Sequence, residues 1–311
     1  MVDYRAAVDD VITVEHCRKN YGKVVAVEDV SFDVARGEIF GLLGPNGAGK
    51  TTIVECLQGL RRRDGGRVEV LGIDPATHPD RLRRRVGSQL QSSALPDRLR
   101  VGEAVKLFGS LHRGVDVDQT LREWDLHELR RRSYAALSGG QRQRLFLALA
   151  LLGQPEVVFL DELTTGLDPH ARRATWDLVR GVRERGATVL LVTHFMEEAE
   201  ALCDRVAIVD RGRIVAQDRP DALTAQFGGG IRMTFTVPGD SDLSYLETVP
   251  GVSSVKTADR LVTVTGEARA AVPVAAALAE RGCHPADFRT HYPTLEDVFL
   301  AMTGRTLREQ A

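Results

Sequence analysis

The pattern of hydrophobic and polar positions predicts alternating strands and helices along most of the chain. Residues 11–16 and 30–34 alternate with a period of two, as half-buried strands do, and residues 39–43 form a continuous apolar run. Apolar runs return at 156–162 and 187–194, and an amphipathic helical segment separates these two. Apolar strands joined by a helix indicate a parallel sheet that is covered on both faces.

A helical subdomain is predicted to interrupt this alternation. Residues 97–153 lack strand patterning and contain several helical segments, and we place the insertion at about 92–153. The stretch that follows Lys50 also has the pattern of a helix. The pattern therefore predicts one α/β domain over residues 1–227, with a parallel core and a helical insertion.

A smaller second domain is predicted at 228–311. Three consecutive glycines in "QFGGGIRM", residues 226–233, mark a linker because they favour neither helix nor strand. Beyond it the pattern predicts, in order, a strand at 231–237, a helix at 242–248, strands at 252–257 and 261–265, a helix at 270–282 that ends at Gly282, a strand at 285–291 and a helix at 294–303. This order is typical of a small α+β domain of the ferredoxin-like type.

Composition and charge narrow the class of protein. The chain has 311 residues, of which 43% are hydrophobic and 27% charged, and these values are those of a soluble globular protein. No window reaches the ~18 uninterrupted apolar residues that cross a bilayer, so we expect any membrane-spanning part to belong to another chain. The four cysteines are far apart, and we expect them to be reduced thiols.

A nucleic-acid partner is not expected. The formal net charge of −2 gives no overall attraction to nucleic acid. Basic runs occur at 61–63, 83–85 and 130–132, but none is interleaved with aromatic residues. They favour solvated helix or loop faces over a nucleic-acid platform.

Residues 44–51, "GPNGAGKT", match the phosphate-binding pattern G-x-x-x-x-G-K-[ST] between an apolar run and a helix. Backbone N–H groups of such a loop surround a phosphate, and the helix N-terminus adds a partial positive charge. Lys50 is predicted to reach the β- and γ-phosphates of a nucleoside triphosphate, and the Thr51 hydroxyl to bind Mg²⁺. The predicted phosphate-binding residues are Gly44, Pro45, Asn46, Gly47, Ala48, Gly49, Lys50, Thr51 and Thr52.

The stretch "VVFLDE", residues 157–162, predicts the second half of this site. Four apolar residues form a buried strand that ends in two acids. Asp161 is predicted to meet Mg²⁺, directly or through water, and Glu162 to orient and polarise the attacking water.

A second anion-binding stretch, "LSGGQRQR", occupies residues 137–144. Its Ser and paired Gly residues would present backbone donors at a helix start. Because residues 44–51 already cover one face of the phosphates, a second such device makes sense if it closes over the nucleotide of a neighbouring molecule. At this point the chain resembles the ATP-binding cassette (ABC) ATPases, whose signature is LSGGQ, over about residues 10–227. The resemblance implies a P-loop NTPase cassette with a RecA-like parallel core, an antiparallel β subdomain and a helical subdomain.

The resemblance implies further roles, which we carry over one residue at a time. Tyr21 matches the aromatic residue that stacks on adenine, Asp168 in "TGLDP" the residue that bridges the halves of a dimer, and His194 the switch histidine that contacts the γ-phosphate. Gln91 matches the glutamine that contacts Mg²⁺, the attacking water and the membrane partner, although Gln89 lies two residues earlier. The signature residues that would face the partner's nucleotide are Ser138, Gly139, Gly140 and Gln141.

One position departs from the family pattern. The family usually has proline directly after the catalytic glutamate, and this chain has Leu163. The change loosens the backbone constraint but removes no catalytic group, so we expect activity to survive.

The tail "YPTLEDVFLAMTGRTLRE", residues 292–309, together with "GLRRRDGGRVEVLGIDP" and "QLQSSALPDRL", resembles the daunorubicin-type drug-resistance ATPases that serve ABC-2 exporters. This implies a Mg²⁺-dependent ATP hydrolase that forms a head-to-tail dimer on a separate ABC-2 membrane subunit at the cytoplasmic face of the membrane, and that powers export of a drug-like or hydrophobic substrate. The alternatives are the ATPase of an ABC importer, a soluble ABC ATPase and a regulatory module that hydrolyses poorly. We disfavour the last because Lys50, Asp161, Glu162 and His194 are all present.

Overall fold

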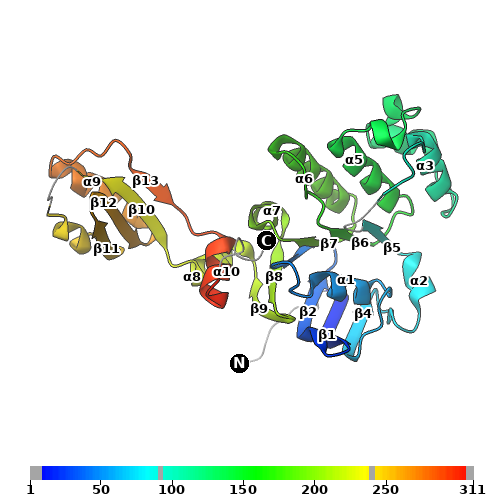
Figure 1. Ribbon diagram of the computed structural model, residues 1–311, viewed down its shortest axis with the longest axis horizontal. Helices are drawn as coiled ribbons and strands as arrows, with labels where there is room; N and C mark the ends of the chain where they lie inside the picture. Colours follow the sequence, from blue (N-terminus) through cyan, green and yellow to red (C-terminus); the bar gives the residue numbers. More distant parts are fainter. Residues whose placement is uncertain (1–8, 90–93, 238–241, 306–311) are drawn as a thin grey trace. The chain divides into compact units, whose positions relative to one another are not determined.

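The chain divides into two compact units (Figure 1) in the computed structural model, which describes residues 9–89, 94–237 and 242–305. The first unit extends to Pro220 and the second begins at Asp221. Helix α8 (Pro220–Phe227) therefore lies almost entirely in the second unit, ahead of the three glycines that we expected to separate the domains.

A nine-stranded sheet forms the centre of the first unit. In spatial order its strands are β4 (Gly65–Val70), β1 (Asp10–Tyr21), β2 (Val24–Ala35), β9 (Arg213–Asp218), β8 (Arg205–Asp210), β3 (Ile39–Leu43), β7 (Thr188–Thr193), β6 (Val157–Asp161) and β5 (Val86–Gln89). The neighbours from β8 to β5 run parallel, whereas β4, β1 and β2 pair antiparallel. The predicted parallel core is confirmed.

The three central strands are buried along their whole length. Every residue of β3, β6 and β7 is buried, which explains why their sequences are continuous apolar runs rather than alternating ones. By contrast, β2 alternates at its buried end, and its Phe32 stacks on Phe40 of β3 with ring centroids 5.3 Å apart. The core thus continues from the parallel strands into the antiparallel ones.

Helices pack around this sheet, and several of them form the predicted insertion. Residues 97–153 hold helices and no strand, as expected. The helices of the first unit are α1 (Lys50–Leu57), α2 (Pro79–Arg83), α3 (Val101–Gly109), α4 (Val117–Glu123), α5 (Gly139–Ala150), α6 (Pro169–Glu184) and α7 (Met196–Leu202), with short 3₁₀ turns η1 (His127–Leu129) and η2 (Tyr134–Ala136). Figure 1 shows α3 and α5 on the side of the unit where β5 forms the sheet edge.

The second unit contains a four-stranded antiparallel sheet in the order β11 (Val252–Ala258), β12 (Leu261–Gly266), β10 (Ile231–Thr236) and β13 (Arg289–His291). This order and these directions are those of a ferredoxin-like domain. The helices of the unit are α8, α9 (Ala271–Glu280) and α10 (Leu295–Thr303), and η3 (Ser244–Thr248) and η4 (Ala268–Ala270) are 3₁₀ turns. Gly282 follows α9 with φ +70°, the left-handed conformation expected of a helix end.

Two elements of this unit differ from the expectation. The predicted helix at 242–248 is the 3₁₀ turn η3, and the strand predicted at 285–291 is only the three residues of β13. The strand is short because the Asp287 side chain, rather than a backbone carbonyl, pairs with the end of β10. The Asp287 carboxylate accepts hydrogen bonds from the backbone N–H and the hydroxyl of Thr236, both at 2.9 Å. Pro285 also lacks the N–H that a longer ladder would need.

The aromatic pair Phe235 and Phe288 anchors the core of the second unit. Phe235 is fully buried, and its ring stacks on Phe288 at 5.6 Å. We expect Phe235→Ala to lower the free energy of unfolding of this unit by about 3–5 kcal/mol, because it removes buried apolar surface and leaves a cavity. Hydrogen exchange of β10 amides measures the effect. Val272→Ala, at a side chain that is 78% exposed, is the control and should change it by less than about 0.5 kcal/mol.

Candidate active site

The loop between β3 and α1 has the backbone that a phosphate cradle requires. Gly44, Gly47 and Gly49 have φ values of +149°, +78° and +105°, which disfavour any other residue. A Cβ atom at Gly44 would clash with the carbonyl oxygen of Val209, and one at Gly49 with that of Ala26. Glycine is therefore needed here both for conformation and for space.

Lys50, the first residue of α1, lies inside this loop rather than in solvent. Its side chain is 5% exposed, and Nζ donates hydrogen bonds to the carbonyl oxygens of Gly44 at 2.7 Å and Pro45 at 2.9 Å. Burial lowers the pKa of the ammonium group, and the nearby Glu162 and Asp161 carboxylates oppose that shift. The loop thus holds a buried cation in place at its centre.

Asp161 ends β6 beside the start of α1. It is 3% exposed, and burial raises its pKa to about 6, with a further contribution from the Glu162 charge; the Lys50 charge and a hydrogen bond from the Thr51 hydroxyl act in the opposite direction. Its Oδ1 atom is buried and has no hydrogen-bond partner among the described residues. A buried, unsatisfied carboxylate oxygen of this kind needs a cation or water.

Glu162 and His194 meet at the ends of neighbouring strands. The Nδ1 atom of His194 lies 3.2 Å from Oε1 of Glu162, and the Glu162 N–H donates to the carbonyl of Val192 at 2.9 Å. Glu162 has φ +50°, an uncommon conformation for a residue with a side chain, so its direction is set by a tight bend directly after β6. Leu163, where the family pattern has proline, is 3% exposed and packs inward.

Lys50, Glu162 and part of the phosphate loop line one cavity. It has a volume of about 400 Å³. Its lining residues are Ala26, Asn46, Gly47, Gly49, Lys50, Thr51, Thr52 and Glu162. Ala26 was not predicted from the sequence, because nothing in an alternating strand sets it apart. Its place here follows from the close approach of its carbonyl to Gly49 and Gly212.

The chemistry of the site fits a magnesium ion held together with a phosphate. Thr51 and Asp161 offer the hard oxygen ligands that Mg²⁺ prefers, and the unpartnered Oδ1 atom of Asp161 is available. No group of three or more His, Cys, Asp or Glu side chains within residues 9–89, 94–237 and 242–305 could hold a metal ion. Phosphate oxygens and water would supply the remaining ligands of such an ion.

Other predicted residues lie outside this cavity. Ser138 is the N-cap of α5, where its Oγ accepts from the Gln141 N–H at 3.3 Å and the Gln141 side chain accepts from the Ser138 N–H at 3.1 Å. Asp168 caps α6 by accepting from the N–H groups of His170 and Ala171, and these bonds lower the pKa of its carboxyl group. These residues therefore order two helix starts.

Tyr21 ends β1 and is 39% exposed, with the Arg61 guanidinium 5.1 Å from its ring centroid. The Lys19 ammonium lies 5.8 Å from the same centroid, so two cations lie beside this partly exposed ring. Gln91 lies outside the described residues. Gln89, the other candidate, is buried at the end of β5, and its Oε1 atom has no partner among the described residues.

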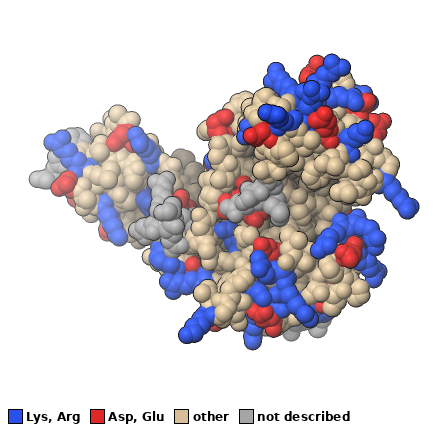
Figure 2. All heavy atoms as spheres, turned by 45° about the vertical axis from the view of Figure 1, so that its right-hand side comes forward, with Lys and Arg blue, Asp and Glu red and all other residues tan. Residues whose placement is uncertain are grey.

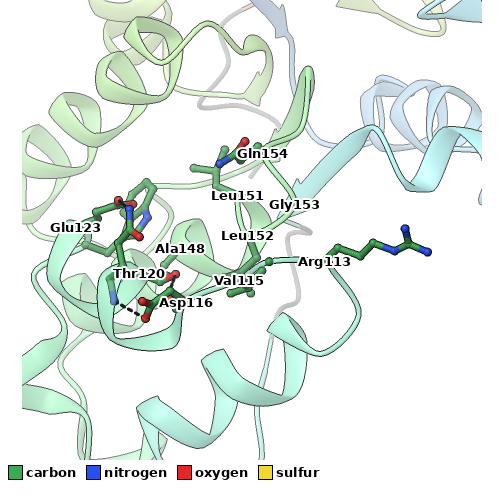
Figure 3. Close-up of a pocket in the computed structure, with 13 residues that line it drawn as sticks. Arg113, Val115, Asp116, Thr120, Glu123, Ala148, Leu151, Leu152, Gly153 and Gln154 are labelled. Carbon is green, nitrogen blue, oxygen red and sulfur yellow. Dashed lines mark hydrogen bonds between the residues drawn. The ribbon is translucent and has the colours of Figure 1, made fainter.

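A second cavity, of about 220 Å³, lies in the helical subdomain (Figure 3). Its carboxylate Asp116 caps α4 by accepting from the N–H groups of Asp118 and Gln119. Arg113 points away from Asp116 in Figure 3. None of the residues that line this cavity belongs to a predicted motif, so we assign the reaction to the cavity beside Lys50.

The surface of the first unit carries mixed charge. Figure 2 shows Lys and Arg side chains interspersed with Asp and Glu over the visible face. Residues of the basic runs form ion pairs with acids, among them Arg63 with Asp74 at 2.7 Å and Arg85 with Glu156 at 2.6 Å. Such pairs favour solvated surfaces over an anion-binding patch. Within the described part of the chain, no helix has the length and apolar character needed to cross a membrane.

Comparisons with known proteins agree with this geometry. A family profile described as ABC transporter matches residues 27–165. The chain is 41% identical to the daunorubicin resistance ATP-binding protein DrrA3 of Streptomyces coeruleorubidus, over 97% of this chain and 99% of that protein. This chain belongs to the ABC transporter ATP-binding proteins. The resemblance seen in its motifs is confirmed.

Other relatives of this ABC protein are named for resistance or export. It is 37% identical to the doxorubicin resistance ATP-binding protein DrrA of Mycobacterium tuberculosis, over 95% of this chain and 94% of that one. It is 39% identical to the Nod factor export ATP-binding protein I of Ralstonia nicotianae, over 96% and 95%. A solved ATP-binding subunit of an ABC transporter superposes with a TM-score of 0.63 at 30% identity, covering 70% of this chain and 93% of that one.

We expect Gly49→Ala to abolish nucleotide binding by this ABC protein. The added Cβ would require φ +105° of alanine and would collide with the Ala26 carbonyl, so the loop must rearrange. Binding of a fluorescent ATP analogue measures the effect.

Gly181→Ala is the matched control. Gly181 lies inside α6, where the added Cβ meets open space, and this change should leave binding intact and stabilise the helix by about 0.5–1 kcal/mol. Normal binding by Gly49→Ala would contradict the role assigned to the loop.

Proposed function

We propose that this protein is the Mg²⁺-dependent ATP-hydrolysing subunit of an exporter, and that it works with a separate ABC-2 type membrane subunit at the cytoplasmic face of the membrane. The observation that carries the proposal is the convergence of Lys50, Asp161, Glu162 and His194 beside one phosphate-sized loop. The end-to-end match to proteins named for drug resistance supports export of a drug-like or hydrophobic substrate.

The residues of the cavity divide the chemistry among them. Lys50 gives up its two carbonyl partners in the loop to contact the β- and γ-phosphates, which supply stronger acceptors. Thr51 and Asp161, with Gln91, would hold Mg²⁺, which would neutralise phosphate charge. Catalysis of this type depends on positioning and charge stabilisation rather than on covalent steps.

Glu162 is the residue proposed to orient the attacking water and accept its proton. His194 lies 3.2 Å from the Glu162 carboxylate, so it can hold that carboxylate in position while its ring contacts the γ-phosphate. Loss of the γ-phosphate on hydrolysis would remove the contacts that favour the closed, ATP-bound dimer of two copies.

The signature stretch is proposed to complete the site of a second copy. Ser138 and Gly139 are exposed at the start of α5, and none of the residues that line the cavity beside Lys50 comes from the signature. Two copies arranged head to tail would place the α5 start of each over the nucleotide of the other, with Gly140, Gln141 and Asp168 nearby. Tyr21 would stack on the adenine of its own chain.

Mixing two inactive variants tests the shared site. Glu162→Gln should bind ATP but lose at least about 100-fold in turnover, because the water loses its base. Ser138→Arg should bind ATP in its own loop but obstruct the one site of the dimer that its own α5 start would cover, leaving the other site able to close. A mixed dimer contains one site with both defects and one site with neither, so the mixture should recover up to roughly a quarter of wild-type activity.

The single-variant preparations are the controls for this mixture, and each should stay inactive at the same total concentration. Failure of the mixture to recover activity, with mixed dimers present, would contradict a site shared between two chains. Normal turnover by Glu162→Gln alone would contradict the role of that carboxylate.

Transport itself is tested with the membrane subunit present. We expect cells that express this chain and its ABC-2 partner to extrude a fluorescent anthracycline, and we expect the Glu162→Gln variant with the same partner not to do so. Retention of the dye measured over time gives the rate. Equal retention in the two strains, or faster uptake by the wild type, would overturn the export proposal while leaving the ATPase result untouched.

A further inference from the structure

A buried carboxylate outside the cavity lies between two parts of the active site. Glu198 of α7 is 1% exposed, and its Oε1 atom accepts a hydrogen bond from Trp176 Nε1 of α6 at 3.2 Å. Acidic side chains are rarely buried so completely unless they are paired. Glu198 also lies four positions after His194, which directly follows strand β7.

The surroundings of Glu198 join three segments. The hydroxyls of Thr193, at the end of β7, and of Thr164, in the loop after Glu162, lie close enough to lower the pKa of its carboxyl group, although burial dominates and raises it. The Oε2 atom of Glu198 and the Oγ1 atom of Thr164 are nevertheless buried without a partner of good geometry in the described part of the chain. Buried polar groups whose hydrogen bonds are only partly made favour small movements that would complete those hydrogen bonds.

A second set of contacts between α6 and α7 involves the aromatic ring next to His194. The Arg172 guanidinium of α6 lies 4.4 Å from the ring centroid of Phe195, and that ring lies 4.0 Å from the His194 ring. Arg172 and Trp176 are one helical turn apart, so α6 presents both toward α7, against which it packs. We call Arg172, Trp176, Phe195 and Glu198 the α6–α7 cluster.

This cluster lies between His194 and the loop that ends at Asp168. His194 would contact the γ-phosphate of one nucleotide, whereas α6 begins at Asp168, in the loop proposed to face the second copy. Thr164 lies between Glu162 and Asp168 in that loop, and the Leu167 N–H donates to its carbonyl at 3.2 Å. A displacement of the His194 ring would move Phe195 and, through it, Arg172 at the start of α6. A second route would run from β7 through Glu198 to Thr164.

We propose that Glu198 is a positioning residue that couples the γ-phosphate contact of His194 to the loop from Glu162 to Asp168, through α6. This inference rests on the proposed ATPase function. It adds a structural route by which binding of the γ-phosphate at His194 would change the conformation of the loop that faces the second copy. Glu198 touches no substrate; it acts by holding Trp176 in position, with the hydroxyls of Thr193 and Thr164 beside its carboxylate.

Kinetics distinguish positioning from mere stability. We expect Glu198→Ala to lower kcat for ATP about tenfold or more with KM changed less than about twofold, because the buried Trp176 donor loses its acceptor while the cavity residues keep theirs. Glu198→Gln keeps an acceptor for Trp176 and can donate to Thr164, so it should restore most of kcat. Glu184→Ala, at an exposed position at the end of α6, should behave as wild type.

Tryptophan fluorescence reads the cluster directly. The chain has two tryptophans, so Trp124→Phe leaves Trp176 as the only one. In that background a nonhydrolysable ATP analogue should shift the emission of Trp176, and ADP, which lacks the γ-phosphate, should not. Adding Glu198→Ala should abolish the shift while the analogue still binds.

The outcomes separate this inference from the proposed function. A wild-type chain that neither binds nor hydrolyses ATP would contradict the proposed function. A chain that hydrolyses ATP but shows no Trp176 response to the analogue would overturn the coupling alone. A shift that survives in Glu198→Ala, or an Glu198→Ala kcat loss matched by an equal loss of folded, nucleotide-binding protein, would also overturn it.

Discussion

The hydrogen-bonded register between β6, β7 and β3 is the constraint on which the active site depends. Asp161 pairs with Val192, and Leu43 pairs with Thr193, so three strands end at the same level of one sheet. The phosphate loop, the acidic pair and His194 each follow directly from one of these ends. Because carboxyl ends of parallel strands share an edge, residues more than a hundred positions apart meet without any long side chain having to reach.

Charge is balanced within that edge rather than by solvent. Lys50 is buried beside two carboxylates, and its own partners are backbone carbonyls that a phosphate can replace. Burial raises the pKa of Asp161 and lowers that of Lys50, and the charge of each residue opposes the shift of the other. The arrangement is costly to bury in isolation, and a polyanion that arrives with a divalent cation would offset that cost.

The sequence could predict the residues whose roles depend on local backbone. Gly44, Gly47 and Gly49 take the positive φ values that their motif implies, and the buried strands follow their apolar runs. It could not predict Ala26 or Glu198, because neither lies in a distinctive local pattern and each owes its place to contacts with segments far along the chain. The same limit explains β13, which is cut short by a side-chain bond from Asp287 that no hydrophobic pattern shows.

The two helix starts that we propose to face a second copy are ordered without a ligand. Ser138 with Gln141, and Asp168 with the N–H groups of α6, satisfy donors that would otherwise point into solvent. A helix start that is already capped keeps its shape while it waits for a partner, so closing over a nucleotide costs little ordering entropy. The proposed closure would then change mainly the relative position of the loops, and the packing of α6 on α7 would link that position to the proposed γ-phosphate contact of His194.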